Sequence, residues 1–332
     1  MAAILGQASR LGVAVRTRGQ GHSLNGSSLP RDGELLLSMH NLRQVRFEAP
    51  GTVTVGAGAV LWVLQHVLRR RGFDLPVLND GYPGPSVGGF VAAGGFGPRS
   101  GEHGAWWDNV SALLLVDGEG RRRRVAGGDA LFPWLFGAMG QLGVVAEATL
   151  AIAPLDPAQP PPYPAGLAFT APALANPEVP PAYAAAESER LFWFTLFAPD
   201  AHLEQAVADL AALERRHAGA LRFQERYRYP IRHRGRVAPL VYPEGVDITA
   251  TGAWGWLGDA SPQGEAQLRE FDRDFMEVAR ARPWARRYVQ SELASGPEAY
   301  ASCFGANYQY FKKLKMESDP RHLLNRGSVF PY

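Results

Sequence analysis

Cysteine is scarce in this chain, because Cys303 is the single cysteine among 332 residues. One cysteine can form neither an intramolecular disulfide nor a cluster of thiolate metal ligands. The 8 histidines are scattered along the sequence instead of grouped, which argues against a zinc site. We therefore expect no bound metal ion.

Long apolar runs and an excess of one charge are also missing. No stretch of about eighteen apolar residues occurs, and the N-terminus lacks the charged-then-apolar layout of a secretory signal. The 34 Lys and Arg residues nearly balance the 32 Asp and Glu residues, so the charge calls for neither a nucleic-acid partner nor an anionic membrane. We expect a soluble, cytoplasmic protein whose partner is a small molecule.

Glycine and proline, by contrast, are abundant and divide the chain into regions. Residues 1–154 alternate short β-rich runs with Gly-rich turns, and the linker 154–181 is too rich in proline for a helix or a central strand. Beyond the linker, two passes of strand and helix favour an antiparallel sheet with helices on one face. A chain of this length is expected to hold two domains. The predicted strands of the second region are 191–197, 221–229 and 253–258, one helix opens at Asp200, and another spans 262–281.

The first chemical signal follows a predicted strand, at residues 16–23 (RTRGQGHS). Glycines let backbone N–H groups come close to an anion, and successive N–H groups in such a turn suit a phosphate. The spacing fits neither the Rossmann nor the P-loop pattern, so neither of those nucleotide-binding mechanisms can be claimed. The pattern alone leaves two readings open, a phosphate-binding loop and an ordinary strand-to-turn glycine pair, and favours the second.

Two further Gly-rich stretches follow at residues 87–110 and 137–145. Glycine gives up folding entropy, which a chain tolerates where its backbone passes close to a ligand. A flexible surface loop is the alternative, but such loops carry more Ser and less Val, Phe and Trp. We interpret both stretches as walls of a ligand site.

The order of these motifs, closed by K-x-x-x-D-P-x-x-L-L-N at residues 315–325, resembles the FAD-binding domain of the vanillyl-alcohol-oxidase and p-cresol-methylhydroxylase (PCMH) superfamily. Within that superfamily, the chain looks most like the cytokinin-dehydrogenase and berberine-bridge branches. The resemblance implies an α+β fold with a PCMH-type FAD-binding domain over residues 1–154. It also implies a substrate domain over residues 155–299 and a segment, 300–332, that returns to the FAD domain.

The resemblance also implies which residues bind FAD. His22 stands where such enzymes attach FAD covalently through the flavin 8α-methyl carbon. Berberine-bridge-type enzymes often add a cysteine link in the second Gly-rich stretch, which has none here, so attachment would be through His22 alone. The residues implied to bind the cofactor are Arg18, Gly19, Gln20, Gly21, His22, Ser23, Gly88, Gly89, Gly94, Gly97, Ser100, His103, Gly143, Val144, Val145 and Asn307.

Four residues are candidates for catalysis. Asp80 lies near the position where cytokinin dehydrogenases carry an aspartate that accepts a proton from the substrate amine, although a turn-forming Asn-Asp-Gly is an equally open reading. Glu225, Tyr227 and Tyr229 share one predicted strand, and alternation puts all three on the same face. If that face meets a flavin, a Tyr or Glu is a base or a substrate clamp. If it meets solvent, which the pattern favours, the three are surface residues.

These features predict an FAD-dependent oxidoreductase that transfers a hydride from a small amine to the flavin while a protein base takes the proton. Oxygen or another electron acceptor would reoxidise the flavin. Two alternatives remain open. One is an alcohol or sugar oxidase of the berberine-bridge type, and the other is a truncated, non-catalytic flavoprotein remnant.

Two departures from the family pattern lead to further expectations. In related enzymes a strand and a turn precede the helix that begins here near Ala2, so we expect that the chain begins late and leaves a sheet edge exposed. The sequence Asn325-Arg326-Gly327-Ser328 stands where cytokinin dehydrogenases tend to place Pro-Gly-Gln. A flavin-contacting glutamine is therefore expected to be missing.

Overall fold

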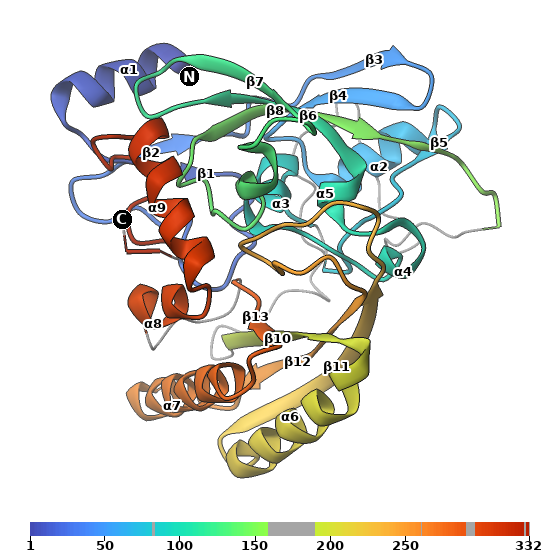
Figure 1. Ribbon diagram of the computed structural model, residues 1–332, viewed down its shortest axis with the longest axis vertical. Helices are drawn as coiled ribbons and strands as arrows, with labels where there is room; N and C mark the ends of the chain where they lie inside the picture. The colour runs from blue at the N-terminus through green and yellow to red at the C-terminus, as the bar shows by residue number, and fades with distance from the viewer. Residues whose placement is uncertain (82–83, 159–189, 260, 290–295, 329, 332) are drawn as a thin grey trace.

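The computed structural model describes residues 1–81, 84–158, 190–259, 261–289, 296–328 and 330–331. An upper body, residues 1–158 and 296–331, lies above a lower body, residues 190–289 (Figure 1). Most of the predicted Pro-rich linker, from residue 159 onward, lies outside the described residues. The mixture of helices and largely antiparallel sheets confirms the predicted α+β class.

The upper body is built on a five-stranded sheet in which all neighbouring strands are antiparallel. The strand order is β3 (Val45–Ala49), β4 (Thr52–Gly56), β8 (Val144–Ala151), β6 (Val110–Val116) and β7 (Arg122–Ala126). The central strand β8 buries every second side chain along most of its length, as a sheet covered on one face requires. Asp117 accepts hydrogen bonds from the backbone N–H groups of Glu119 and Arg121 and so closes the tight β6–β7 turn.

A second, smaller sheet positions the glycine loop of residues 19–23. Strand β1 (Val15–Arg18) pairs in parallel with β2 (Leu35–Ser38) and, on its other edge, bridges Leu324 near the end of the chain. The start and the end of the sequence therefore lie side by side (Figure 1). Helix α1 (Ala2–Leu11) precedes this sheet, α2 (Leu61–Arg69) covers the upper body, and the short strands β5 (Phe73–Asp74) and β9 (Ala153–Pro154) pair beside it.

The second Gly-rich stretch folds into short helices instead of a loose loop. They are α3 (Val87–Ala93), α4 (Ser100–His103) and α5 (Trp106–Asn109), and η1 (Phe132–Leu135) follows them. Helix α3 begins because the Ser86 hydroxyl accepts a hydrogen bond from the N–H of Gly89, and it ends because Gly94 adopts a left-handed conformation. Both ends of α3 are thus fixed, which holds its glycines against the sheet.

The lower body is an antiparallel sheet with helices on one face, as the sequence predicts. Its strand order is β11 (Leu221–Ile231), β12 (Ile248–Leu257), β10 (Arg190–Pro199) and β13 (Arg286–Arg287). Helices α6 (Leu203–His217) and α7 (Pro262–Arg280) pack on one face around Phe194 and Phe275. Helix α6 does not open at Asp200 as predicted, because residues 200–202 form a single 3-10 turn, η3 (Asp200–His202).

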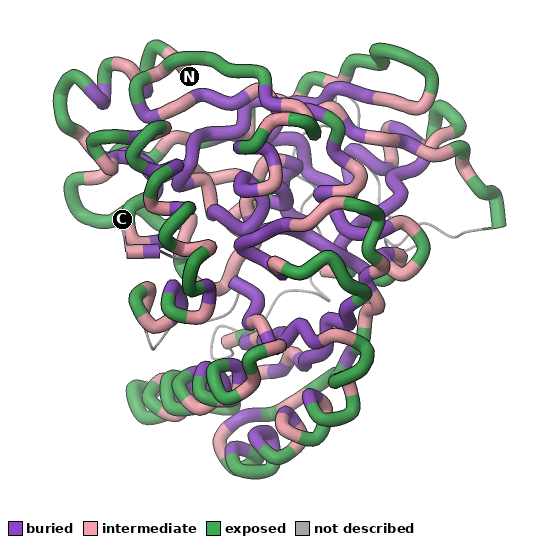
Figure 2. The backbone as a smooth tube through the Cα atoms, in the orientation of Figure 1, coloured by how far each residue is buried: buried purple, intermediate pink, exposed green. Residues whose placement is uncertain are grey.

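The other face of the lower sheet is turned toward the upper body. The ring of Phe96 in the upper body lies 5.3 Å from that of Phe197 and 5.1 Å from that of Tyr288. Buried residues fill this region, whereas the outer sides of α6 and α7 are exposed (Figure 2). The two bodies therefore share an aromatic contact region.

The C-terminal helices α8 (Gly296–Ser302) and α9 (Ala306–Ser318) pack beside the upper body (Figure 1). Phe311 and Phe330 are fully buried, with ring centroids 4.5 Å apart, and Lys315 is buried with them. None of the helices in the described part of the chain combines the length and the apolar character that a bilayer crossing requires.

Candidate functional site

A pocket with an empty volume of about 910 Å³ lies in the upper body between the glycine loop, α3 and the third Gly-rich stretch. Part of this volume is open to solvent, so the pocket is a cleft in the surface and not a closed cavity. All three Gly-rich stretches of the sequence contribute to its wall. Segments that are more than a hundred residues apart along the chain therefore meet in one concave site.

Sterics fix the first side of the pocket. A Cβ atom at Gly19 would lie 2.0 Å from the Oγ atom of Ser86, so only glycine lets the loop approach the start of α3. Gly21 has a φ of 72°, which also favours glycine. The Oε1 atom of Gln20 is buried without a hydrogen-bond partner among the described residues. Since buried polar atoms are normally paired, this oxygen indicates a bound group that donates to it.

The opposite side of the pocket is mostly apolar. Leu142, Val144 and Val145 line it at the start of β8, next to Ala138 and Met139. Such a surface suits a flat aromatic ring, whereas the glycine loop suits an anion. The pocket thus combines the two surfaces that a dinucleotide with a flat ring requires.

Ten of the predicted cofactor-binding residues line this pocket. They are Gly19, Gln20, Gly21, His22, Ser23, Gly88, Gly89, Gly143, Val144 and Val145. The other six, Arg18, Gly94, Gly97, Ser100, His103 and Asn307, are not part of the wall.

Several of those six residues shape the backbone behind the wall. A Cβ at Gly97 would lie 1.7 Å from the carbonyl oxygen of Leu78, so glycine is needed for that close approach. The fully buried Ser100 hydroxyl accepts a hydrogen bond from the N–H of Gly97. His103 contacts Arg99, and burial lowers its pKa, whereas Asn307 lies on the first turn of α9. Their cofactor-binding role stays a prediction, because none of these contacts belongs to the pocket wall.

The sequence reasoning did not name other wall residues singly. Those inside its predicted Gly-rich stretches are Thr17, Ala92, Ala93, Ala138, Met139, Gly140 and Leu142, and those outside them are Ser27, Ser28, Met39, Ala57, Pro85, Ser86, Leu135 and Asn325. Ser86 had a readable signal, since a serine three residues before Gly89 is a typical N-cap. Asn325 closes the L-L-N motif, but nothing local marks it as a pocket residue.

His22 lines the pocket, and Asp80 lies close enough to shift its titration. Burial lowers the pKa of the His22 imidazole, and the negative charge of Asp80 partly opposes that shift. The imidazole is therefore neutral near neutral pH, with one ring nitrogen free of a proton. A Cβ at Gly81 would lie 3.1 Å from Nε2 of His22, which places the loop after Asp80 against the ring.

Asp80 also joins the two bodies. The hydroxyl of Tyr229, on β11, donates a 2.5 Å hydrogen bond to Oδ2 of Asp80. Burial and the nearby carboxylate raise the pKa of Tyr229 well above its usual range, so the phenol keeps its proton and acts as a donor. His22, Asp80 and Tyr229 thus form one cluster, to which the lower sheet contributes Tyr229.

The structure does not support a role as a base for the other two candidates on β11. The Tyr227 hydroxyl donates to the carbonyl of Phe194 at 2.9 Å and contacts Thr195 and Trp193, and burial raises its pKa well above the usual value. The hydroxyl proton of Tyr227 is therefore already donated to a backbone carbonyl of the sheet. Glu225 is exposed and accepts a hydrogen bond from the indole of Trp254. A bulge between Phe223 and Glu225 interrupts the register of the strand.

No group of three or more His, Cys, Asp or Glu residues that could hold a metal ion occurs within the described ranges.

Residues 1–126 match the sequence profile of a family described as an FAD binding domain. The N-terminal part of this chain is similar to FAD-binding domains. The glycine loop, α3 and β6 all fall within the matched residues, whereas the wall residues 135–145 and Asn325 lie beyond them. This match confirms the resemblance drawn from the order of the motifs.

Curated relatives with an oxidoreductase name support the same family. An uncharacterized oxidoreductase of the fasciation locus in Rhodococcoides fascians is 38% identical over 142 residues, 42% of this chain and 32% of the relative. D-lactate dehydrogenase of Archaeoglobus fulgidus is 30% identical over 162 residues, 46% of this chain and 36% of the relative. Cytokinin dehydrogenase 4 of Arabidopsis thaliana is 33% identical over 150 residues, 42% of this chain and 28% of the relative.

The aligned regions span about a third of these relatives' own lengths. Berberine bridge enzyme-like proteins are among the other relatives, as the resemblance implied. The chain is thus related to FAD-dependent oxidoreductases through its FAD-binding domain.

Proposed function

We propose that this chain holds FAD in the glycine-lined pocket and uses it to oxidise a small organic amine. One observation carries the proposal: the pocket ends at His22, beside the Asp80 carboxylate that Tyr229 of the lower body contacts. A cofactor site and a candidate proton acceptor therefore adjoin each other. That juxtaposition is what an oxidation by hydride and proton transfer requires.

The residues present fit FAD. The loop from Gly19 to Ser23 would hold the pyrophosphate through its backbone, and the unpartnered Oε1 of Gln20 would accept a hydrogen bond from the cofactor. Leu142 and the valines at the start of β8 would pack on the flat ring. Bound FAD supplies a hydride acceptor, and the protein supplies orientation and the handling of the proton.

Asp80 would accept the proton from the substrate amine. Tyr229 donates to Oδ2, and a carboxylate has two oxygens, so Oδ1 remains for a substrate N–H group. Tyr229 cannot compete for the proton, because its raised pKa keeps the phenol protonated. The hydrogen bond would also fix the direction in which the carboxylate points.

His22 would carry a covalent bond to the flavin. A neutral imidazole has a lone pair on one nitrogen, and the burial that lowers the pKa of His22 keeps it in that form. The family resemblance implies the flavin 8α-methyl carbon as the partner. His22 therefore has both the position in the pocket wall and the protonation state that the link requires.

An alcohol or hydroxy acid is the second candidate substrate, because one relative is named D-lactate dehydrogenase. A substrate with a carboxylate needs a cationic partner in the site. The negative charge of Asp80 instead favours a substrate that is itself cationic, which is why the amine comes first.

The first experiment is an absorption spectrum of the purified full chain before and after acid precipitation. Flavin bands that stay with the precipitate are expected, and they would support covalent attachment. The variant His22→Ala should release its flavin into the supernatant. A protein that stays colourless after incubation with FAD would overturn the proposal and favour a non-catalytic remnant.

The second experiment measures bleaching of the flavin bands without oxygen. Primary and secondary amines should reduce the bound flavin, whereas D-2-hydroxy acids and simple alcohols should not. Bleaching by hydroxy acids alone would replace the amine with the second candidate. Readmitting oxygen or adding a dye then shows which acceptor restores the colour.

A further inference from the structure

The C-terminal tail, residues 319–328, contributes Asn325 to the pocket wall and lies beyond the residues that match the FAD-binding domain. We infer that docking of this tail and binding of the cofactor are coupled, and that Asn325 is the residue that couples them. The inference rests on the proposed FAD site. It assigns to Asn325 a positioning role that its sequence surroundings do not reveal.

Asn325 spans the pocket. Its side-chain Oδ1 accepts hydrogen bonds from the backbone N–H of Thr17 at 2.8 Å and from the Thr17 hydroxyl at 3.2 Å. Its Nδ2 donates to the carbonyl of Gly140 at 2.9 Å. Thr17 leads into the glycine loop, Gly140 belongs to the third Gly-rich stretch, and all three residues line the pocket. One buried amide therefore ties the two facing walls together.

Asn325 is itself held in an unusual conformation. Its φ of 48° lies in the left-handed region, which asparagine tolerates better than most residues. Its backbone N–H donates to the carbonyl of Val15 on β1 at 2.9 Å. A Cβ at Gly140 would lie 2.6 Å from Nδ2 of Asn325, so the two residues fit each other closely.

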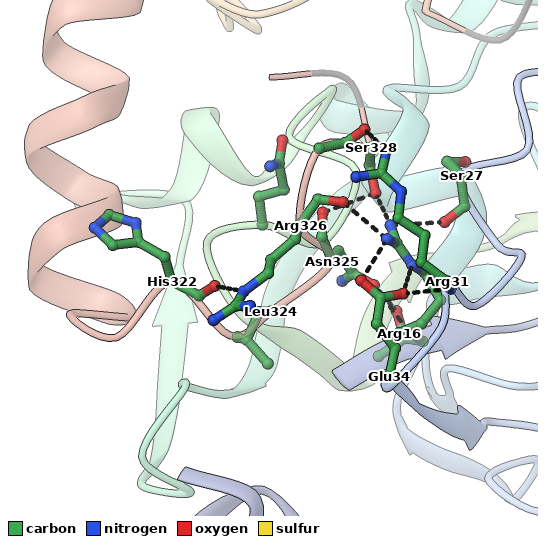
Figure 3. Close-up of polar contacts among 12 residues, drawn as sticks. Arg16, Ser27, Arg31, Glu34, His322, Leu324, Asn325, Arg326 and Ser328 are labelled. Carbon is green, nitrogen blue, oxygen red and sulfur yellow. Dashed lines mark hydrogen bonds and ion pairs between the residues drawn. The ribbon is translucent and has the colours of Figure 1, made fainter. Parts of the chain in front are cut away.

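Arg16 anchors the tail to the glycine loop (Figure 3). Its guanidinium is almost completely buried, and each of its five N–H donors has an acceptor. Two donors go to the carboxylate of Glu34, just before β2, at 2.9 and 2.8 Å. One donor goes to the carbonyl of Ser27, which follows the glycine loop, and the remaining two reach the Arg326 carbonyl and the Ser328 hydroxyl.

Lys315 anchors the tail to the other wall. Its buried Nζ donates to the carbonyl of Gln141 at 2.8 Å and to that of Leu324 at 3.1 Å, and pairs with Asp319 at 2.7 Å. Asp319 in turn accepts hydrogen bonds from the backbone N–H groups of Leu323 and Leu324. The tail is thus fixed to both walls by two buried cations, and Asn325 lies between those anchors.

This arrangement has a thermodynamic consequence. A cofactor that needs both walls in place binds the docked tail better than the undocked tail, so it stabilises docking. By reciprocity, the factor by which FAD favours the docked tail equals the factor by which docking raises the affinity for FAD. A change that loosens the tail therefore lowers the affinity for FAD. The coupling can be measured as a change in FAD affinity and as protection of the tail from hydrogen exchange. Neither measurement requires a substrate.

Hydrogen exchange of the full-length wild type with and without FAD tests the coupling directly. We expect FAD to slow exchange in residues 319–328 as well as in the glycine loop. Slower exchange in the loop with no change in the tail would overturn the inference. If FAD protects neither segment because it does not bind, the proposed cofactor site fails, and the inference fails with it.

Fluorescence titration of FAD on Asn325→Ala and Arg326→Ala gives the second test, with every protein, the wild-type reference included, carrying His22→Ala so that FAD binds reversibly. Arg326 is a matched control in the same tail, because its exposed side chain donates to the carbonyl of His322 while its own carbonyl still accepts from Arg16. Asn325→Ala should raise the dissociation constant about tenfold, and Arg326→Ala should leave it within about twofold. Equal affinities for Asn325→Ala and the wild type would overturn the role of Asn325. If Asn325→Ala does not fold, the exchange experiment on the wild type decides.

Discussion

The two sides of the site are built in different ways. The cofactor side is made mostly of backbone, with glycines that allow a loop, a helix and a strand to approach one another. The substrate side is made of side chains, with the carboxylate of Asp80 in the upper body and the phenol of Tyr229 in the lower body. Backbone constraints leave a local mark in the sequence, whereas a contact between distant side chains does not. The same contrast predicts how each side responds to mutation.

The largest effect is expected on the backbone side, from Gly19→Ala. The added Cβ would lie 2.0 Å from the Ser86 hydroxyl oxygen, so the loop must move away from α3. We expect FAD affinity to fall by about a hundredfold or more, as measured by fluorescence titration. Thermal unfolding of the apoprotein, measured in parallel, separates a displaced loop from a protein that does not fold.

Two matched variants identify the cause of that loss. Gly128→Ala adds a methyl group where no atom lies within 4 Å, and it should bind FAD normally. Combining Gly19→Ala with Ser86→Gly removes the clashing hydroxyl and should recover part of the affinity. If the double variant is no better than Gly19→Ala, the clash with Ser86 is not the reason for the loss.

The next effect is expected on the side-chain side, from Asp80→Asn. The amide cannot accept the substrate proton, so the rate of flavin reduction should fall by about 10²–10⁴-fold while FAD binding stays intact. Stopped-flow absorbance of the flavin bands measures this rate. Glu225→Gln changes an exposed carboxylate on β11 in the same way, and it should alter the rate by less than about twofold. Similar losses in both variants would mean that Asp80 has no special role.

A smaller effect is expected from Tyr229→Phe, which removes the donor to Asp80 and keeps the ring. Without this hydrogen bond the carboxylate loses orientation and its charged form loses a stabilising donor. We expect roughly tenfold slower flavin reduction with FAD binding intact, measured by the same stopped-flow absorbance. An unchanged rate would show that the hydrogen bond from Tyr229 does not assist Asp80.

Much of the fold could be predicted from the sequence, because the relevant signals are local. Ser261 and Pro262 mark the start of α7, and Asp117 marks the β6–β7 turn. Asp200 misled the prediction of α6, because its carboxylate accepts from the Thr249 hydroxyl and pairs with Arg232 instead of capping the helix.

The site could be predicted only in part, for the same reason. The glycines indicate the pocket in the sequence, since they allow a positive φ or a close approach of the backbone to neighbouring atoms. Asn325 could not be found, because its partner Thr17 is 308 residues away along the chain. The three candidates on β11 differ in their partners, which the sequence could not indicate either. Tyr229 meets Asp80 of the upper body, Tyr227 is bonded within its own sheet, and Glu225 is exposed and accepts from the indole of Trp254.

The smallest effect concerns stability at the joint between the two bodies, where Asp108 on α5 lies in a small pocket beside His233 and Arg236 of the lower body. Its Oδ2 accepts a hydrogen bond from the N–H of Ala105, but its Oδ1 is buried without a partner among the described residues. Burial raises the pKa of Asp108 to about 6. The charged form is therefore disfavoured in the folded protein.

The sign of the pH dependence follows from that shift. The folded pKa lies above the unfolded value of 3.8, so the folded state holds the proton more tightly, and stability falls as the pH rises from about 4 to about 6. Asp108→Asn keeps an acceptor for Ala105 and removes the charge. It should therefore match the wild type near pH 4 and exceed its free energy of unfolding above pH 6 by on the order of 1–3 kcal/mol. Urea unfolding at pH 4, 6 and 8 measures the difference, with the exposed Asp32→Asn as control. A variant that is less stable than the wild type at pH 8 would show that the Asp108 carboxylate has a charged partner that offsets its burial.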